Sequence, residues 1–282
     1  MLTDQQVKEY RELGFVVFPG FLKAAEIAGI LKDVESITAG ATRANHDASR
    51  MEMEPRQSPE GKLVRRLYEP CTYYPRFRAL SESPELLDCV EQLLGPNLSF
   101  HYSKLNMKPP SIGSIVEWHQ DLMYYPLTNR DSLAVLLYLD DADRHNGCLQ
   151  VIPERHAGPP LDHTVDGIFQ GRVTGAIDET EAVFVEGGAG AAILMHGMTP
   201  HASAPNTSPY PRRTLILSYR AADAFPIFVG ESTAEAESHV RLVRGEAVRE
   251  ARFTAGTFPI PTYPKKTKSL YELQELSHQT RA

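Results

Sequence analysis

A series of short, strand-like segments after Gly95 constrains the fold of this chain more than any other feature. The segments are apolar or alternate between apolar and polar residues, and Gly, Pro and Asn separate them. They lie at 98–108, 133–141, 148–152, 182–186, 191–195 and 214–220. Many short strands separated in this way predict an antiparallel sandwich or barrel.

The residues before this series predict mainly helices. Thr3 and Gln6 have the spacing of a capping box, which marks the start of a helix. Residues 39–62 show no period and predict a long loop, either a lid or binding segment or a surface excursion. The other expected elements are listed along the chain as a helix at 3–12, a strand at 15–18, a helix at 23–38 and a helix at 83–94.

We find no internal repeat and no linker, so all 282 residues are expected to form one domain. Helices within 3–95 are expected to pack on one face of an all-β core at about 97–222. A C-terminal extension at 223–282 follows, which we expect to pack on a partner subunit or to cover the active site. Its expected elements are extended segments at 258–261 and 263–264 and a terminal helix at 267–280.

Composition narrows the partners and the compartment. The formal net charge of −7 disfavours nucleic acid as the main partner. No apolar run approaches the roughly 18 residues of a membrane span, and the N-terminus does not resemble a secretory signal. Three sparse cysteines, Cys71, Cys89 and Cys148, argue against a disulfide framework. We therefore expect a cytoplasmic protein, and the sequence leaves its oligomeric state open.

The stretch WHQD at 118–121 is either part of a metal site or a polar patch on a strand. In a strand, His119 and Asp121 point to the same face. One imidazole and one carboxylate are two of the three ligands in the 2-His-1-carboxylate triad, which binds Fe(II) and leaves positions open for substrate and O₂. Among ten histidines, His201 is the best third ligand, because it lies between two strands, and His196 is its rival.

A basic pair after His201 predicts a carboxylate clamp. Arg212 enters a strand, where its planar guanidinium can hold a carboxylate through two hydrogen bonds. Only one of the adjacent Arg212 and Arg213 can face inward, and the other is expected at the surface. The Ser203 hydroxyl, two residues after His201, can donate to the same carboxylate.

Five segments, taken in order, resemble the phytanoyl-CoA dioxygenase family of Fe(II)- and 2-oxoglutarate-dependent oxygenases. They are LGPN (94–97), NMKPP (106–110), WHQD (118–121), NGCLQVIPERHAG (146–158) and HASAPNTSPYPRR (201–213). The resemblance spans about residues 5–222. It implies an all-β core with flanking helices, in which the core is a double-stranded β-helix, a cupin-like jelly-roll.

The resemblance also implies roles for residues. Iron ligands fall on His119, Asp121 and His201, and the 2-oxoglutarate arginine falls on Arg212. A pocket strand falls on Tyr102, Lys104, Asn106 and Lys108, with Lys104, Asn106 and Ser203 placed near 2-oxoglutarate. Expected substrate-wall residues are Tyr102, Trp118, Met123, Tyr124 and Arg66, together with the segment at 39–66. Because Asp121 is present rather than a small residue, the resemblance favours oxygen transfer over halogenation.

The expected reaction is hydroxylation of an unactivated C–H bond with O₂ and 2-oxoglutarate, releasing succinate and CO₂. The expected substrate is small, and anionic, amino-acid-like or a natural product. The same chemistry also gives desaturation, cyclisation or C–heteroatom cleavage. Two other classes stay open: a jelly-roll metalloenzyme that does not use 2-oxoglutarate, and a non-catalytic binding module that keeps only the fold.

Overall fold

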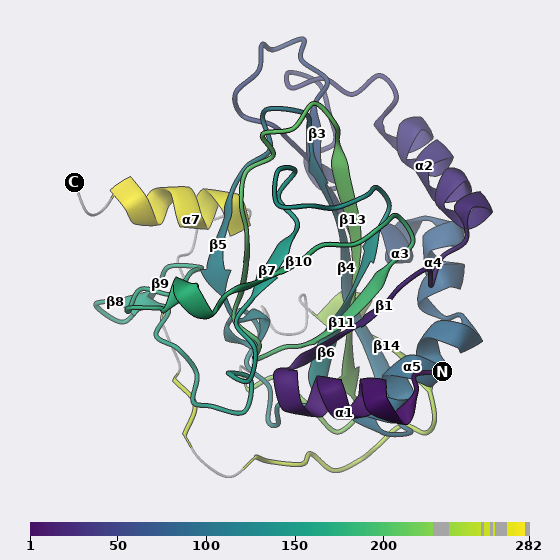
Figure 1. Ribbon diagram of the computed structural model, residues 1–282, viewed down its shortest axis with the longest axis vertical. Coiled ribbons are helices and arrows are strands. Elements are labelled where there is room, and N and C mark those ends of the chain that lie inside the picture. Colours follow the sequence, from purple (N-terminus) through teal and green to yellow (C-terminus); the bar gives the residue numbers. More distant parts are fainter. Residues whose placement is uncertain (228–236, 255–256, 260–261, 263–269, 280–282) are drawn as a thin grey trace.

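The computed structural model describes residues 1–227, 237–254, 257–259, 262 and 270–279, and its core is a pair of antiparallel sheets (Figure 1). The major sheet has the order β1-β11-β6-β13-β4-β3-β2, and β14 also pairs with β4. Its strands are β1 (Phe15–Phe18), β2 (Met51–Met53), β3 (Val64–Tyr68), β4 (Leu98–Lys108), β6 (Ser132–Tyr138), β11 (Ala192–His196), β13 (Arg212–Ala221) and β14 (Arg241–Arg244).

A smaller sheet with the order β10-β7-β12-β5 completes the core. Its strands are β5 (Val116–His119), β7 (Leu149–Val151), β10 (Val183–Val185) and β12 (His201–Ser203), and a separate hairpin joins β8 (Thr164–Val165) to β9 (Ile168–Phe169). Strand β6 shows how the layers are packed. Leu136 and Tyr138 pack against residues of the smaller sheet such as Val151, whereas Leu137 packs on the other side. This alternation has the period of a strand that is buried on both faces.

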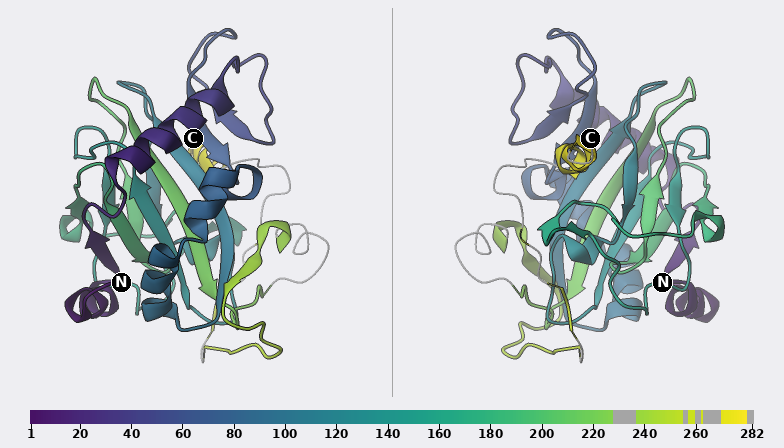
Figure 2. Two further views of the ribbon diagram at one scale, coloured as in Figure 1. Left: turned by 90° about the vertical axis from the view of Figure 1, so that its right-hand side faces the viewer. Right: turned by 90° about the vertical axis from the view of Figure 1, so that its left-hand side faces the viewer.

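Five helices precede the long strand β4. They are α1 (Asp4–Leu13), α2 (Ala24–Thr38), α3 (Pro70–Tyr73), α4 (Pro75–Ser81) and α5 (Pro84–Leu94). Their apolar side chains, such as Phe77 and Leu86, share one buried cluster with Leu105 and Leu137 of the major sheet. In the left view of Figure 2, helices lie in front of the strands. The helices thus cover the outer face of the major sheet, and its inner face is left for the smaller sheet.

The structure confirms the jelly-roll core with flanking helices. It also confirms the capping box, because the Gln6 amide N–H donates to Thr3 Oγ1 at 3.2 Å and the Thr3 N–H donates to Gln6 Oε1 at 2.9 Å. The expectation of a loop without structure at 39–62 is wrong in part. Strand β2 lies within it and pairs with β3, which itself pairs with β4. Helices α3 and α4 were not expected.

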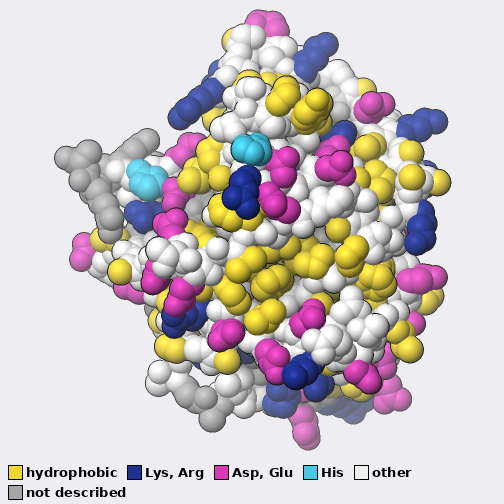
Figure 3. Space-filling view, in the orientation of Figure 1, with side chains coloured by type: hydrophobic (Ala, Val, Ile, Leu, Met, Phe, Trp, Pro, Cys, Tyr) yellow, Lys and Arg dark blue, Asp and Glu magenta, His cyan; other side chains and the backbone are white. Residues whose placement is uncertain are grey.

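The C-terminal region contains helix α7 (Leu270–Gln279), which confirms a helix within 267–280. Of the expected extended segments, Ile260, Pro261, Tyr263 and Pro264 lie outside the described residues. The three cysteines are free thiols and buried. Within the described ranges, every helix is too short or too polar to cross a membrane. On the face seen in Figure 3, Lys and Arg side chains are dispersed among acidic and apolar ones.

Candidate active site

Three side chains, from two neighbouring strands of the smaller sheet and the turn that follows one of them, converge on one point. His119 ends β5, and His201 begins β12 directly opposite it in the antiparallel register. The sequence predicted that Asp121 continues the strand of His119. In the structure, Asp121 instead starts a 3₁₀ turn at Asp121–Met123. The turn still brings its Oδ1 to 3.7 Å from His119 Nε2 and 3.8 Å from His201 Nε2. One ligand atom from each residue lies within 4.8 Å of the others, and all three residues are buried.

The main chain orients both imidazoles in the same way. His119 Nδ1 lies 2.8 Å from the Glu117 carbonyl oxygen, and His201 Nδ1 lies 3.0 Å from the Thr199 carbonyl oxygen. A carbonyl only accepts, so each Nδ1 carries the proton and each Nε2 presents a lone pair toward Asp121. Burial holds the pKa of both histidines below the usual value, which favours the neutral form. Two neutral imidazoles and a carboxylate in this arrangement fit Fe(II).

A second polar group surrounds Arg212 on β13. The Arg212 guanidinium donates to Thr214 Oγ1 at 2.8 Å, to Ser203 Oγ at 2.7 Å and to the Gly147 carbonyl. Ser203 Oγ in turn donates to the Gly147 carbonyl at 2.9 Å. Lys108 lies beside this group and donates to the carbonyls of Ser203, at 3.2 Å, and Ala204. Burial lowers the pKa of Arg212 and of Lys108.

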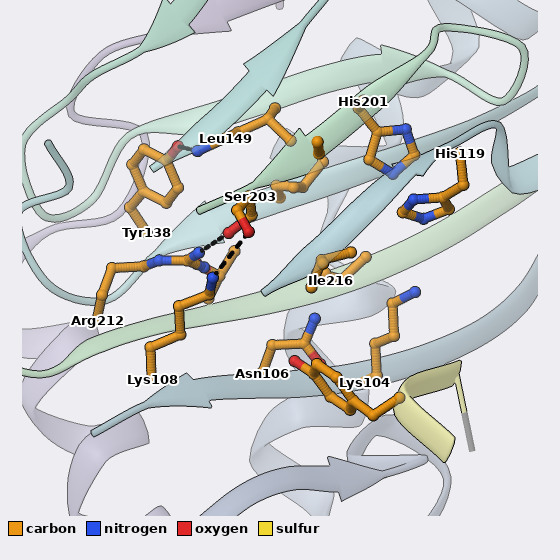
Figure 4. Close-up of a pocket in the computed structure, with 15 residues that line it drawn as sticks. Lys104, Asn106, Lys108, His119, Tyr138, Leu149, His201, Ser203, Arg212 and Ile216 are labelled. Atoms are coloured by element: carbon orange, nitrogen blue, oxygen red, sulfur yellow. Dashed lines mark hydrogen bonds between the residues drawn. The ribbon is translucent and has the colours of Figure 1, made fainter. Parts of the chain in front are cut away.

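One cavity between the sheets connects the two groups (Figure 4). Figure 4 shows Arg212 and Lys108 at one end and the imidazoles of His119 and His201 at the other, with Asn106 between them. Apolar side chains such as Leu136 and Ile216 fill the remaining wall. The full lining is Lys104, Asn106, Lys108, Val116, His119, Leu136, Tyr138, Leu149, His201, Ala202, Ser203, Arg212, Thr214, Ile216 and Tyr271.

The structure brings several of the expected site residues to this cavity. Lys104, Asn106 and Ser203 line it together with Arg212. His196, the rival ligand, lies instead against Tyr10 and His156, with ring centroids 6.2 and 5.2 Å away. Arg213 turns outward from the cavity to form an ion pair with Asp140.

The expected substrate-wall residues do not line this cavity. Trp118 packs with Ile152, Val173 and Ala202 in a separate cluster, and Met123 packs with Phe169 and Leu273. Tyr124 lies edge-on to His119, with ring centroids 5.6 Å apart, and donates to the Gly171 carbonyl. Tyr102 lies beside Tyr125, with ring centroids 5.5 Å apart. Arg66 lies behind Asn106 and donates from Nε to Asn106 Oδ1 at 2.9 Å.

Sequence reasoning missed three contributors to the site. Lys108 was placed on the pocket strand but was given no role, although its alternation with Lys104 and Asn106 was the available signal. The Gly147 carbonyl accepts from both Arg212 and Ser203. Every residue has a carbonyl, so no pattern of side chains could predict this role. Tyr271 reaches the cavity from α7, and no motif surrounds it in the sequence.

Comparison with known proteins decides the family. The family model for phytanoyl-CoA dioxygenase (PhyH) matches residues 10–214. The chain belongs to the phytanoyl-CoA dioxygenase family. A "Probable alpha-ketoglutarate-dependent hypophosphite dioxygenase" from Stutzerimonas stutzeri is 36% identical to this dioxygenase over 234 residues, which cover 80% of this chain and 81% of that protein. A methylphosphonate hydroxylase from Gimesia maris is 29% identical over 220 residues, which cover 78% and 81% of the two chains.

Solved structures agree with this placement. EctD from S. alaskensis, solved with 2-oxoglutarate and 5-hydroxyectoine, has a TM-score of 0.63 and 26% identity to this dioxygenase. The match covers 78% of this chain and 77% of EctD. With the buried His-Asp-His group, these findings make the protein an Fe(II)- and 2-oxoglutarate-dependent dioxygenase.

Proposed function

We propose that this dioxygenase hydroxylates a small phosphorus oxyanion, namely hypophosphite or a short alkylphosphonate. Its two relatives described above are named for such compounds. The observation that carries the proposal is the distribution of cations in the cavity. Lys108 and Arg212 lie at one end of the cavity. Lys104, on the same strand as Lys108, extends toward the two histidines (Figure 4). Two separate cationic positions suit two anions that bind at the same time.

The Arg212 end would hold the distal carboxylate of 2-oxoglutarate. Arg212 supplies N–H donors, among them an Nε without a partner, and Lys108 adds a second positive charge. Ser203 accepts from Arg212 and so helps to orient the guanidinium. Apolar Leu136 and Ile216 line the same cavity and exclude water along the carbon chain. The opposite, 2-oxo acid end of the co-substrate would then face His119, Asp121 and His201, which would hold the iron.

The Lys104 end would hold the substrate oxyanion. Among the described residues, no carboxylate lies within ion-pair distance of Lys104, so its ammonium is available to an anion. Asn106 accepts from Arg66 through Oδ1, which leaves its amide nitrogen to donate into the cavity. The substrate's C–H or P–H bond would thereby be oriented toward the metal.

Iron chelated by 2-oxoglutarate supplies the oxidative chemistry, in which O₂ and 2-oxoglutarate are converted to succinate, CO₂ and a hydroxyl group on the substrate. The chain's own residues orient both anions and exclude water from the reacting atoms. They also hold the ligand imidazoles in one tautomer, which the carbonyls of Glu117 and Thr199 fix.

A pair of variants tests the assignment of the two ends. Hypophosphite, methylphosphonate and ethylphosphonate would be supplied to the iron-loaded enzyme, and succinate and oxidised product would be measured together. Lys104→Met should raise the KM for the oxyanion about tenfold and leave the KM for 2-oxoglutarate unchanged, whereas Arg212→Met should do the reverse. If both variants raise the same KM, the assignment of two anion positions is wrong.

A separate measurement tests the metal site. Under anaerobic conditions, Fe(II) and 2-oxoglutarate should give the weak visible band of a chelated 2-oxo acid. Asp121→Ala should lose the band together with tight iron binding, because the variant lacks the carboxylate between the two imidazoles. An unchanged band in Asp121→Ala would remove Asp121 from the ligand set. If the wild-type enzyme gives the band but oxidises only amino-acid-like compounds, the phosphorus oxyanion proposal fails and the enzyme class stands.

A further inference from the structure

Helix α7 brings to the cavity wall a side chain with no role so far. Tyr271 is only 3% exposed and lines the cavity together with Lys104 and Asn106. It lies beyond the segment at 10–214 that the family model matches. We propose that Tyr271 determines substrate size in this dioxygenase and holds Arg66 in place against Asn106, next to the position proposed for the substrate oxyanion. The inference rests on the proposed function and extends it to a residue outside the family's matched segment.

Buried contacts fix the position of α7 against the body of the enzyme. Gln274 accepts from the Glu117 N–H at 3.2 Å and donates to the Gly171 carbonyl at 2.6 Å. Ser277 accepts from Arg172 Nε at 2.6 Å, and Leu273 packs on Met123 and Phe169. Such contacts place a helix in one orientation. The wall that Tyr271 forms is therefore a defined surface that can discriminate between substrates.

The Tyr271 ring also contacts two arginines. The guanidinium carbons of Arg65 and Arg66 lie 4.2 and 4.7 Å from the ring centroid, within the range of cation–π attraction. Arg65 has an acidic partner, because it forms an ion pair with Glu52 at 2.7 Å. Arg66 differs in its partner, because its Nε donates to the Asn106 amide rather than to a carboxylate. Each arginine also has buried nitrogen without a hydrogen-bond partner, Nη2 in Arg66 and Nε and Nη1 in Arg65.

Arg66 is thus a buried cation held by the Asn106 amide and by two aromatic rings, of which Tyr271 is nearer than Tyr68. Among the described residues, no carboxylate lies within ion-pair distance of it. A buried charge without a counter-ion is costly unless a ligand supplies one. Through its contact with Asn106, Arg66 would lie next to the wall that Lys104 and Asn106 form and would raise the positive potential where the substrate oxyanion binds. Tyr271 would keep the guanidinium at this position, which makes it a positioning residue as well as part of the wall.

The bulk of Tyr271 gives the enzyme a means of selecting short substrates. The Tyr271 ring forms part of the cavity wall and occupies the volume of several methylene groups. One methylene in an apolar pocket changes specificity by about 10- to 200-fold. We therefore expect the wild-type enzyme to prefer methylphosphonate to propylphosphonate, and removal of the ring to weaken this preference.

Three substitutions separate the size of Tyr271 from its contact with the arginines. Tyr271→Phe keeps the ring, Tyr271→Leu keeps much of the bulk without the aromatic face, and Tyr271→Ala removes both. The ratio of kcat/KM for propylphosphonate to that for methylphosphonate should rise about tenfold in Tyr271→Ala and stay near the wild-type ratio in Tyr271→Phe. Tyr271→Leu should raise the KM for methylphosphonate severalfold, with a smaller change in the ratio, because Arg66 loses the nearer of its two aromatic contacts and keeps only Tyr68, at 6.0 Å.

Tyr210→Ala is the matched control, since Tyr210 is 70% exposed and does not line the cavity. Circular dichroism and thermal unfolding would show that each variant folds. An unchanged substrate ratio in a folded Tyr271→Ala enzyme would overturn the proposal for substrate size. An unchanged KM for methylphosphonate in Tyr271→Leu would overturn the role in holding Arg66.

Failure of the proposed function gives a different result. If the wild-type enzyme oxidises no phosphorus oxyanion, the substrate class is wrong, and Tyr271 is then tested by succinate formation without substrate. Removal of the ring opens the wall and admits water to the cavity, so this uncoupled succinate formation should rise severalfold in Tyr271→Ala but not in Tyr271→Phe. If both variants match the wild type, Tyr271 does not close the cavity.

Discussion

Lys108 and Arg212 are direct cross-strand partners on β4 and β13, and both side chains are buried beside Ser203. Like charges placed opposite each other destabilise a sheet. Within the described part of the chain, no carboxylate lies within ion-pair distance of either group, and Arg212 Nε has no hydrogen-bond partner. The pair is therefore incomplete without an anion, which is the electrostatic reason to place the distal carboxylate of 2-oxoglutarate there.

Substitution of either cation should weaken co-substrate binding. Arg212→Met and Lys108→Met should each raise the Kd for 2-oxoglutarate about ten- to a hundredfold, since hydrogen bonds to charged groups contribute about 1.5–3 kcal/mol. Anaerobic titration of the visible band with 2-oxoglutarate measures this Kd. Unchanged affinity in both variants would place the co-substrate elsewhere.

Gly147→Ala should disturb the same end of the cavity through the main chain. Gly147 has a φ of +76°, and a Cβ there would lie 2.2 Å from the Ala204 carbonyl oxygen, which accepts from Lys108. We expect a loss of about 1–3 kcal/mol in the free energy of unfolding, measured in urea, and weaker 2-oxoglutarate binding. Gly20→Ala is the control, because Gly20 has a φ of +65° and open space around it. If the two variants behave alike, only backbone strain is at work.

His196 should make the metal-free protein sensitive to acid. Burial lowers its pKa to about 3, whereas the usual value is 6.5. Above pH 6.5 the ring is neutral in both states and contributes nothing to the pH dependence. As the pH falls from 6.5 toward 3, the unfolded chain takes up a proton that the folded chain does not, so stability is lost.

His196→Asn tests this, since its side-chain oxygen can replace Nδ1 as the acceptor for the Met198 N–H, which lies 3.0 Å away. Between pH 7.5 and pH 5, the wild type should lose about 2 kcal/mol more stability than the variant. Denaturant unfolding of the metal-free proteins at the two pH values measures the difference. Equal losses would mean that the ring titrates normally in the folded state.

Trp118→Phe should affect stability without affecting catalysis. Trp118 is buried against Ile152, Val173 and Ala202 rather than in the cavity. We expect a loss of about 1–3 kcal/mol in the free energy of unfolding, with KM values for substrate and 2-oxoglutarate near those of the wild type. A change in the substrate KM alone would return Trp118 to the pocket wall.

The sequence was sufficient where local periodicity decides which face a side chain occupies. Alternation along β4 correctly placed Lys104, Asn106 and Lys108 on one surface, and the structure has all three along the cavity. The same alternation excludes Trp118 from the cavity wall, because Trp118 is adjacent to His119 and so points to the opposite face. Val116 is two residues from Trp118, so strict alternation would turn it away from the cavity as well. It lines the cavity nevertheless, at a place where the pairing of β5 with β12 shifts register between His201 and Ser203.

Long-range packing decided what the sequence did not predict. Tyr271 reaches the cavity because Gln274 bonds to the main chain of Glu117, 157 positions away, and no local pattern encodes this contact. Strand β2 forms because its backbone pairs with β3, although the segment at 39–62 has no period of its own. Tyr102 follows the alternation of β4, but its ring contacts Tyr125, which arrives from a different part of the chain.

Strand β4 runs along the cavity and sets the spacing of the polar side chains that line it. Lys104, Asn106 and Lys108 occupy every second position, so each step along the wall is about 6.6 Å. The iron end and the Arg212 end are thereby held at a fixed separation by backbone geometry. A slip of one residue would turn all three side chains to the other face. Redesign for a longer or shorter co-substrate would therefore have to proceed in steps of two residues.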